Sequence, residues 1–220
     1  MTKLPSYSLL RVICFQILAV TTATSCRPGE KGKWVFHGSD GFQIEQKCRL
    51  CTPSVPWLSH IPTNATGTLQ LILASGQMIG EYQMSNGVKH GHSRFWNATG
   101  QPIMDACYLH GKLNGLYTTW HDNGIKASEG MFDEDREVGQ HREWYETGVI
   151  KTDGEYGNGL RNGRYRRWMA DGEILADGIY SNMWAQSGTM VLERVEGKPP
   201  VIGVYSNGAL IEKRQWQKTQ

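Results

Sequence analysis

The chain has 220 residues, of which 26 are glycine, 8 are tryptophan and 39% are hydrophobic. Glycine at this density without a collagen period indicates frequent tight turns, and the tryptophans and tyrosines favour strands, so long helices are not expected. Loss of Lys3 and Arg11 with an amino-terminal signal leaves 21 basic and 21 acidic residues. This balance excludes a nucleic-acid role, because neutralising phosphates requires a basic surface.

Residues 1–25 have the pattern of a secretory signal peptide. Lys3 and Arg11 give a positive start, residues 12–20 are an apolar run, and small residues occupy 21–25. The apolar run is too short to span a bilayer as a stable anchor. The sequence therefore predicts that the protein is exported.

Cys26 directly follows this signal. The run Ala23-Thr24-Ser25-Cys26 resembles the lipobox of bacterial lipoproteins, in which the cysteine thiol carries the lipid. The same residues also fit an ordinary cleavage site between small residues. Both interpretations stay open, so the expected location is the cell envelope, through a lipid anchor at Cys26, or the secreted fraction.

Residues 26–66 show no clear periodicity, and we expect a small irregular segment that contains Cys48 and Cys51. A disulfide between these two cysteines is favoured, because an exported protein reaches an oxidising compartment. A redox motif would need a βαβ context that is not visible. A zinc site with His37 and His60 would usually show a second, compactly spaced ligand pair.

Residues 67–187 contain five units of 24 residues, which is the period of a repeat architecture. The same residue types recur at equivalent positions of the units. The opening glycines are Gly67, Gly91, Gly115, Gly139 and Gly163. Five residues later stand Ile72, Trp96, Trp120, Trp144 and Trp168, and four residues after these stand Gly76, Gly100, Gly124, Gly148 and Gly172. Each unit is expected to be a β-hairpin whose two-residue type I′ turn ends in that last glycine.

A two-residue turn fixes which residues face each other across the hairpin. The expected pairs are Gln70 with Glu81, Arg94 with Asp105, Thr118 with Glu129, Arg142 with Asp153, and Arg166 with Asp177. They predict ion pairs between strands, each contributing about 0.2–1 kcal/mol. In the next row, the rings of Tyr117, His141 and Tyr165 are expected to cover Gly130, Gly154 and Gly178 on the partner strand.

The predicted fold is all-β, an antiparallel meander of about ten strands. Residues 188–220 contain a strand-like run at 201–205 and the turn Asn207-Gly208, so they are expected to finish the sheet as a degenerate cap. The tryptophans of the repeats form one row. These large rings are expected mainly to bury surface between repeats, and the alternative is an aromatic interaction face.

The pattern Gly-x-x-x-x-Trp-x-x-x-Gly, followed by acid-Gly-x-aromatic and Asn-Gly-x-x-x-Gly, resembles the variant MORN repeats of bacterial proteins. The unit from Gly139 to Gly163 matches throughout, and the resemblance covers residues 67–187. It implies an exported protein, often a lipoprotein, and some members carry an antitoxin label. The wider MORN family implies protein association and, in eukaryotes, sometimes binding of acidic phospholipids. It implies no catalytic residue, so none is assigned.

No nucleophile, base and orienting group come together in the sequence, so we expect no enzyme and no cofactor. We expect an interaction scaffold of the envelope or the secreted fraction, with an unidentified protein partner. The alternatives are an antitoxin-like partner of a toxin and a module that binds anionic phospholipids. A redox or zinc protein that uses Cys48 and Cys51 is less favoured.

Overall fold

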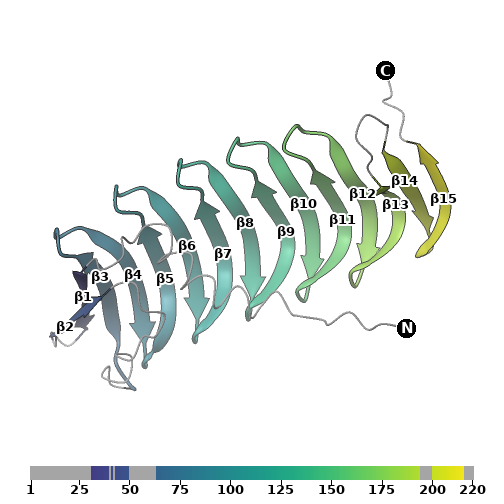
Figure 1. Cartoon of the computed structure of the whole chain (residues 1–220). Coiled ribbons are helices and arrows are strands. Elements are labelled where there is room, and N and C mark those ends of the chain that lie inside the picture. The colour runs from purple at the N-terminus through teal and green to yellow at the C-terminus, as the bar shows by residue number, and fades with distance from the viewer. Residues whose placement is uncertain (1–30, 40, 42, 50–62, 194–199, 216–220) are drawn as a thin grey trace. The chain divides into compact units, whose positions relative to one another are not determined.

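The computed structural model describes residues 31–39, 41, 43–49, 63–193 and 200–215. All regular structure within these residues is β-strand, and they form fifteen strands (Figure 1). The chain divides into two compact units between Gly124 and Ile125, and each unit is a sheet of antiparallel strands. The predicted all-β class is therefore confirmed.

The first unit is a sheet with the strand order β7-β6-β5-β4-β3-β1-β2. Its strands are β1 (Lys31–Gly38), β2 (Gln43–Arg49), β3 (Gly67–Leu73), β4 (Met78–Ser85), β5 (Val88–Trp96), β6 (Pro102–Leu109) and β7 (Lys112–Trp120). β1 lies between β2 and β3 and pairs with both. Val35 and Phe36 of β1 are each 2% exposed, so this strand belongs to the core.

The second unit follows chain order throughout. Its strands are β8 (Lys126–Asp133), β9 (Arg136–Trp144), β10 (Ile150–Gly157), β11 (Leu160–Trp168), β12 (Ile174–Ser181), β13 (Trp184–Glu193), β14 (Val201–Ser206) and β15 (Ala209–Gln215). The tyrosines Tyr165 and Tyr180 are buried, whereas every residue of β15 is exposed.

The predicted number of about ten strands is too low. The five repeats supply the ten strands β3 to β12, as expected, and β13 to β15 continue the meander after them. The other addition is β1 and β2, which lie in the segment that was expected to be irregular. Periodicity did not identify β1 because its adjacent residues Val35 and Phe36, which point to opposite faces, are both buried, so the strand does not alternate between polar and apolar residues.

The turn that ends in the repeated glycine is not a two-residue type I′ turn, so that prediction was wrong. In the fourth repeat, Gly148 N donates to Tyr145 O and Tyr145 N donates to Val149 O, each at 2.8 Å, which encloses three residues. Only Gly148 has a positive φ, 83°, whereas Thr147 before it does not. This is a type I turn followed by a glycine bulge.

The two-residue turns lie at the opposite end of the hairpins, where each repeat connects to the next. Both central residues have a positive φ, for example 52° at Asn158 and 77° at Gly159, and Gly157 pairs with Leu160 around them. Equivalent turns with both φ positive are Asn86-Gly87, His110-Gly111, Glu134-Asp135, Asn182-Met183 and Asn207-Gly208. These connections therefore have the type I′ geometry.

The expected register is nevertheless found. Gln70 faces Glu81, Arg94 faces Asp105, Arg142 faces Asp153 and Arg166 faces Asp177. Compared with a two-residue turn, the three-residue loop shifts the strand pairing by one residue. A bulge on the second strand of the hairpin then restores the expected pairing. In the first repeat, for instance, Ile72 pairs with Met78 and Leu71 with Gly80, so Ile79 is the extra residue. The pair Thr118 with Glu129 would join the two units and stays a prediction.

Candidate functional site

Side chains alternate along each strand, and this gives the repeats two different faces. The face called here the tryptophan face carries the repeated tryptophans and the acidic column. The opposite face, called the buried face, carries the aromatic core, including Tyr82, Tyr108, Phe132, Tyr165 and Tyr180. The two faces differ in the contacts that their charged and aromatic side chains make.

Each tryptophan of the row ends the first strand of its hairpin. Trp96 and Trp120 end β5 and β7 in the first unit, and Trp144 and Trp168 end β9 and β11 in the second, all of them half-buried. In the second unit, Lys126 Nζ lies 5.7 Å from the centroid of Trp144, and the Arg166 guanidinium carbon lies 5.4 Å from that of Trp168. The rings therefore bury part of their surface and leave part accessible to solvent.

Three of the predicted pairs form the expected polar contacts on the tryptophan face. Gln70 Nε2 donates to Glu81 at 3.4 Å, Arg94 Nε lies 3.6 Å from Asp105, and Arg142 Nε lies 3.5 Å from Asp153. The arginine side chains are 42–47% exposed, so each of these pairs contributes little alone.

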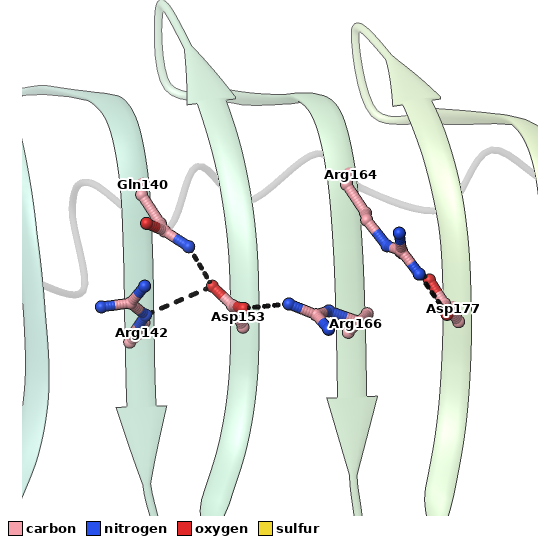
Figure 2. Close-up of polar contacts among 6 residues, drawn as sticks. All are labelled: Gln140, Arg142, Asp153, Arg164, Arg166 and Asp177. Carbon is pink, nitrogen blue, oxygen red and sulfur yellow. Dashed lines mark hydrogen bonds and ion pairs between the residues drawn. The ribbon is translucent and has the colours of Figure 1, made fainter.

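The pair Arg166 with Asp177 forms the register but not the ion pair, as Figure 2 shows. Arg166 turns to the preceding repeat, where its Nη2 donates to Asp153 Oδ2 at 2.6 Å. Asp177 instead accepts two hydrogen bonds from Arg164, at 3.1 and 2.8 Å. This bidentate geometry suits a carboxylate and a guanidinium.

Asp153 is the buried centre of this network, with 6% exposure. Its carboxylate accepts from Gln140 Nε2 at 2.7 Å and contacts Arg142 on β9, and it receives Arg166 from β11 on the other side (Figure 2). A buried carboxylate needs such partners, because an unpaired charge in this position would be costly. Asp153 therefore ties three neighbouring strands together.

Rings on the buried face also lean toward the preceding repeat. His141 faces Gly154 in the expected register, yet its ring lies against Gly130, and the ring of Tyr165 lies against Gly154. His141 Nε2 contacts the carbonyl oxygen of Met131 at 2.7 Å, which points to the same side. Burial lowers the pKa of His141, although this contact opposes the shift.

Cations are placed over rings of the buried face in both units, a feature that the sequence patterns did not indicate. Lys89 Nζ lies 4.4 Å from the centroid of Tyr82 and 4.8 Å from that of Tyr108. At the equivalent repeat position, the Arg161 guanidinium lies 4.0 Å from the centroid of Tyr165 and 5.7 Å from that of Tyr180. The equivalent positions between Lys89 and Arg161 are Leu113 and Glu137, so no column of cations was visible in the sequence.

Cys107 lies beside a histidine and a carboxylate on the tryptophan face. His92 Nδ1 is 3.7 Å from Cys107 Sγ and 3.4 Å from Asp105 Oδ1. Burial and the negative charge of Asp105 raise the pKa of the Cys107 thiol. The thiol is thus held in its protonated, weakly nucleophilic form.

The other cysteines with assigned roles cannot be placed. Cys26 and Cys51 lie outside the described residues, as does the side chain of Cys48, whose backbone is in β2. Within the part of the chain that is described, no three His, Cys, Asp or Glu side chains are grouped to hold a metal ion. The same part contains no helix of the length and apolarity needed to cross a membrane.

No protein-family model and no curated protein matches this chain.

Proposed function

We propose that this chain is an exported, non-catalytic interaction scaffold of the MORN-repeat type, which binds a protein partner through its tryptophan face. The observation that carries the proposal is the recurrence of a half-buried tryptophan at the same strand end in successive hairpins. A single exposed ring needs no explanation, whereas rings repeated at equivalent positions of neighbouring hairpins form an extended surface within each unit.

The composition of this face fits protein recognition. Tryptophan and arginine are enriched at the energetically dominant positions of interfaces, where they combine a large contact area with a polar group. On β9 and β11, Trp144 and Trp168 each stand two residues from an arginine, Arg142 and Arg166. Because these arginines are partly held by Asp153, their orientation is fixed before a partner binds.

The proposed location is the envelope or the secreted fraction, and it rests on the sequence of residues 1–26. A signal peptide supports export, and Cys26 offers a point of lipid attachment that would keep the repeats at a membrane surface. The proposed partner is accordingly a protein of the same compartment.

The test is quantitative affinity purification of the full chain from its native envelope, comparing three proteins. These are the wild type, the double variant Trp144→Ala/Trp168→Ala, and the control Trp184→Ala. Trp184 is 75% exposed and stands outside the tryptophan row, so it matches the residue type without the proposed role.

We expect one partner to be recovered with the wild type and with Trp184→Ala, and to fall at least tenfold with the double variant. A loss of about 2 kcal/mol for one central tryptophan already exceeds that factor. Circular dichroism checks that the double variant keeps its strands. Equal recovery from all three folded proteins would contradict the proposal.

A further inference from the structure

The buried face of the second unit contains an open groove formed by β11, β12 and β13. Its volume is about 400 Å³, and its lining includes Arg161, Arg167, Tyr165, Tyr180, Met190 and Leu192. This volume falls within the range of small-ligand sites in proteins. Leu192 is 38% exposed, so the apolar side of the groove is accessible from solvent.

The charged residues that line the groove are all positive. Two arginines and no acidic residue belong to its lining. Arg161 is half-buried and stacks on Tyr165, while its side chain hydrogen-bonds to Tyr156. Burial raises the pKa of Tyr156 to about 12, so this hydroxyl is neutral at pH 7 and does not balance the guanidinium charge.

Glu137 on β9 is a carboxyl group that interacts with Arg161, but it does not line the groove. Burial raises the pKa of Glu137, and the effect of Arg161 in the opposite direction is smaller. A guanidinium has five N–H donors in a planar fork, which leaves several of them for an external acceptor. With no acidic residue in the lining, the half-buried Arg161 charge marks the position in the groove where an anion would be stabilised.

We propose that this groove binds a small free carboxylate with an apolar body, of the kind represented by a medium-chain fatty acid. The carboxylate pairs with the Arg161 guanidinium in the two-point geometry that suits both groups. The apolar chain lies along Met190 and Leu192, where it removes apolar surface from water. Arg167, six residues further along β11, contributes positive potential to the same groove.

The test is calorimetric titration of the full chain with hexanoate, octanoate and decanoate below their aggregation concentrations. The affinity should rise by up to about fourfold for each added methylene, as expected for progressive burial of the chain. Decanol and decyltrimethylammonium, which keep the chain but lack the carboxylate, should bind at least tenfold more weakly than decanoate. An affinity that does not depend on chain length or on the charge of the head group would overturn the proposal.

Arg161→Met keeps the length and apolar contacts of the side chain and removes its charge. We expect it to weaken decanoate binding at least tenfold and to leave decanol binding unchanged. Arg164→Met is the matched control, because Arg164 lies on the same strand, pairs with Asp177 on the opposite face and should leave decanoate binding unchanged.

Arg167→Met keeps the proposal testable if Arg161→Met fails to fold, because Arg167 does not take part in the stacking on Tyr165 and Tyr180. It should weaken decanoate binding by a smaller factor than Arg161→Met. Unchanged decanoate affinity in both folded variants would refute the assignment. So would binding of an acidic peptide in this groove with no measurable binding of decanoate.

Discussion

Asp153 shows how one buried side chain couples successive repeats. It is 6% exposed and receives Arg142 from its own hairpin and Arg166 from the next one. Arg166 faces both Asp153 and Asp177 in the register, so its choice of partner is not fixed by pairing alone. The more buried carboxylate gains more from the arginine, because water screens its charge less.

Replacement of Asp153 by asparagine should lower the free energy of unfolding by about 2 kcal/mol, the size expected when a buried charged hydrogen bond is lost. The partial exposure of Arg142 and Arg166, 42% and 37%, keeps the expected loss below that of a fully buried ion pair. Urea unfolding followed by circular dichroism measures the change.

Asp177→Asn is the matched control for this prediction. It removes the same charge at the equivalent position of the next repeat. Its partner Arg164 is exposed, so solvent screens the ion pair between Arg164 and Asp177. We expect a clearly smaller loss of stability. Equal losses for the two variants would mean that burial of Asp153 does not set its contribution.

For single residues, the sequence predicted which residues face each other across a hairpin. It did not predict which of the two neighbouring strands their side chains contact. Counting from the turn placed Arg142 opposite Asp153 and Tyr165 opposite Gly178, and both are observed. Arg166 and Tyr165 nevertheless contact the preceding repeat. A strand inside a sheet has two neighbours at similar distances, and the register within one hairpin says nothing about the choice between them.

The strands are joined by two kinds of turn, a three-residue turn within each hairpin and a type I′ turn between hairpins. The register of the hairpins was predicted correctly although the type of the turn within them was not. Thr147-Gly148 and Asn158-Gly159 both look like two-residue turns in the sequence. Only the second has two residues of positive φ, since Thr147 keeps a negative φ before Gly148. A threonine branched at Cβ is disfavoured at positive φ, whereas asparagine tolerates it. This difference separates Thr147-Gly148 from Asn158-Gly159, but it is not a general signal, because Asn123 before Gly124 also lacks a positive φ.

Asn158→Val should therefore lower the free energy of unfolding by about 1–2 kcal/mol, the cost of placing a branched residue in the left-handed region. Thr147→Val should cost much less, because Thr147 has no such φ and its hydroxyl accepts only a long hydrogen bond, 3.5 Å, from Val149 N. Thermal or urea unfolding of the two variants checks the difference. If Thr147→Val proved the more damaging change, the assignment of the two turn types would be wrong.

The strands that precede the repeats were the hardest elements to predict. β1 and β2 precede the repeats, where no period guides the alignment, and β1 becomes a strand through its pairing with β3. Of the expected site, the position of the tryptophans followed from their spacing. The groove of the second unit did not, because Arg161, Leu175 and Met190 come together only when β11, β12 and β13 are side by side.

Across the molecule, the contacts that hold the repeats run from neighbour to neighbour. At five of the six described type I′ connections, the backbone N–H of the second turn residue donates to a carbonyl 22 residues earlier, as Gly111 does to Lys89 and Gly159 to Glu137 at 2.8 and 2.9 Å. The shift of Arg166 and Tyr165 toward the preceding repeat adds side-chain contacts in the same direction. Stability in such an array is close to a sum of repeat and interface contributions.

This organisation predicts that a destabilising substitution affects only the strands close to it. Gly154→Ala is a suitable test. A Cβ at this position would lie 2.5 Å from the Tyr165 ring, so β10 and β11 must separate slightly. Amide hydrogen exchange should accelerate in these two strands and in the adjacent β9 and β12, while β4, β5 and β6 in the first unit keep the protection of the wild type.

Gly172→Ala is the control for this experiment, because nothing lies within 4 Å of a Cβ there and the change strains only its own turn, at a φ of 84°. It should accelerate exchange around residues 169–173 without separating β10 from β11. Uniform acceleration in every strand with Gly154→Ala would instead require one cooperative core that extends through the whole chain. Contacts limited to adjacent hairpins cannot transmit a disturbance in that way, since each interface that stays intact protects the strands behind it.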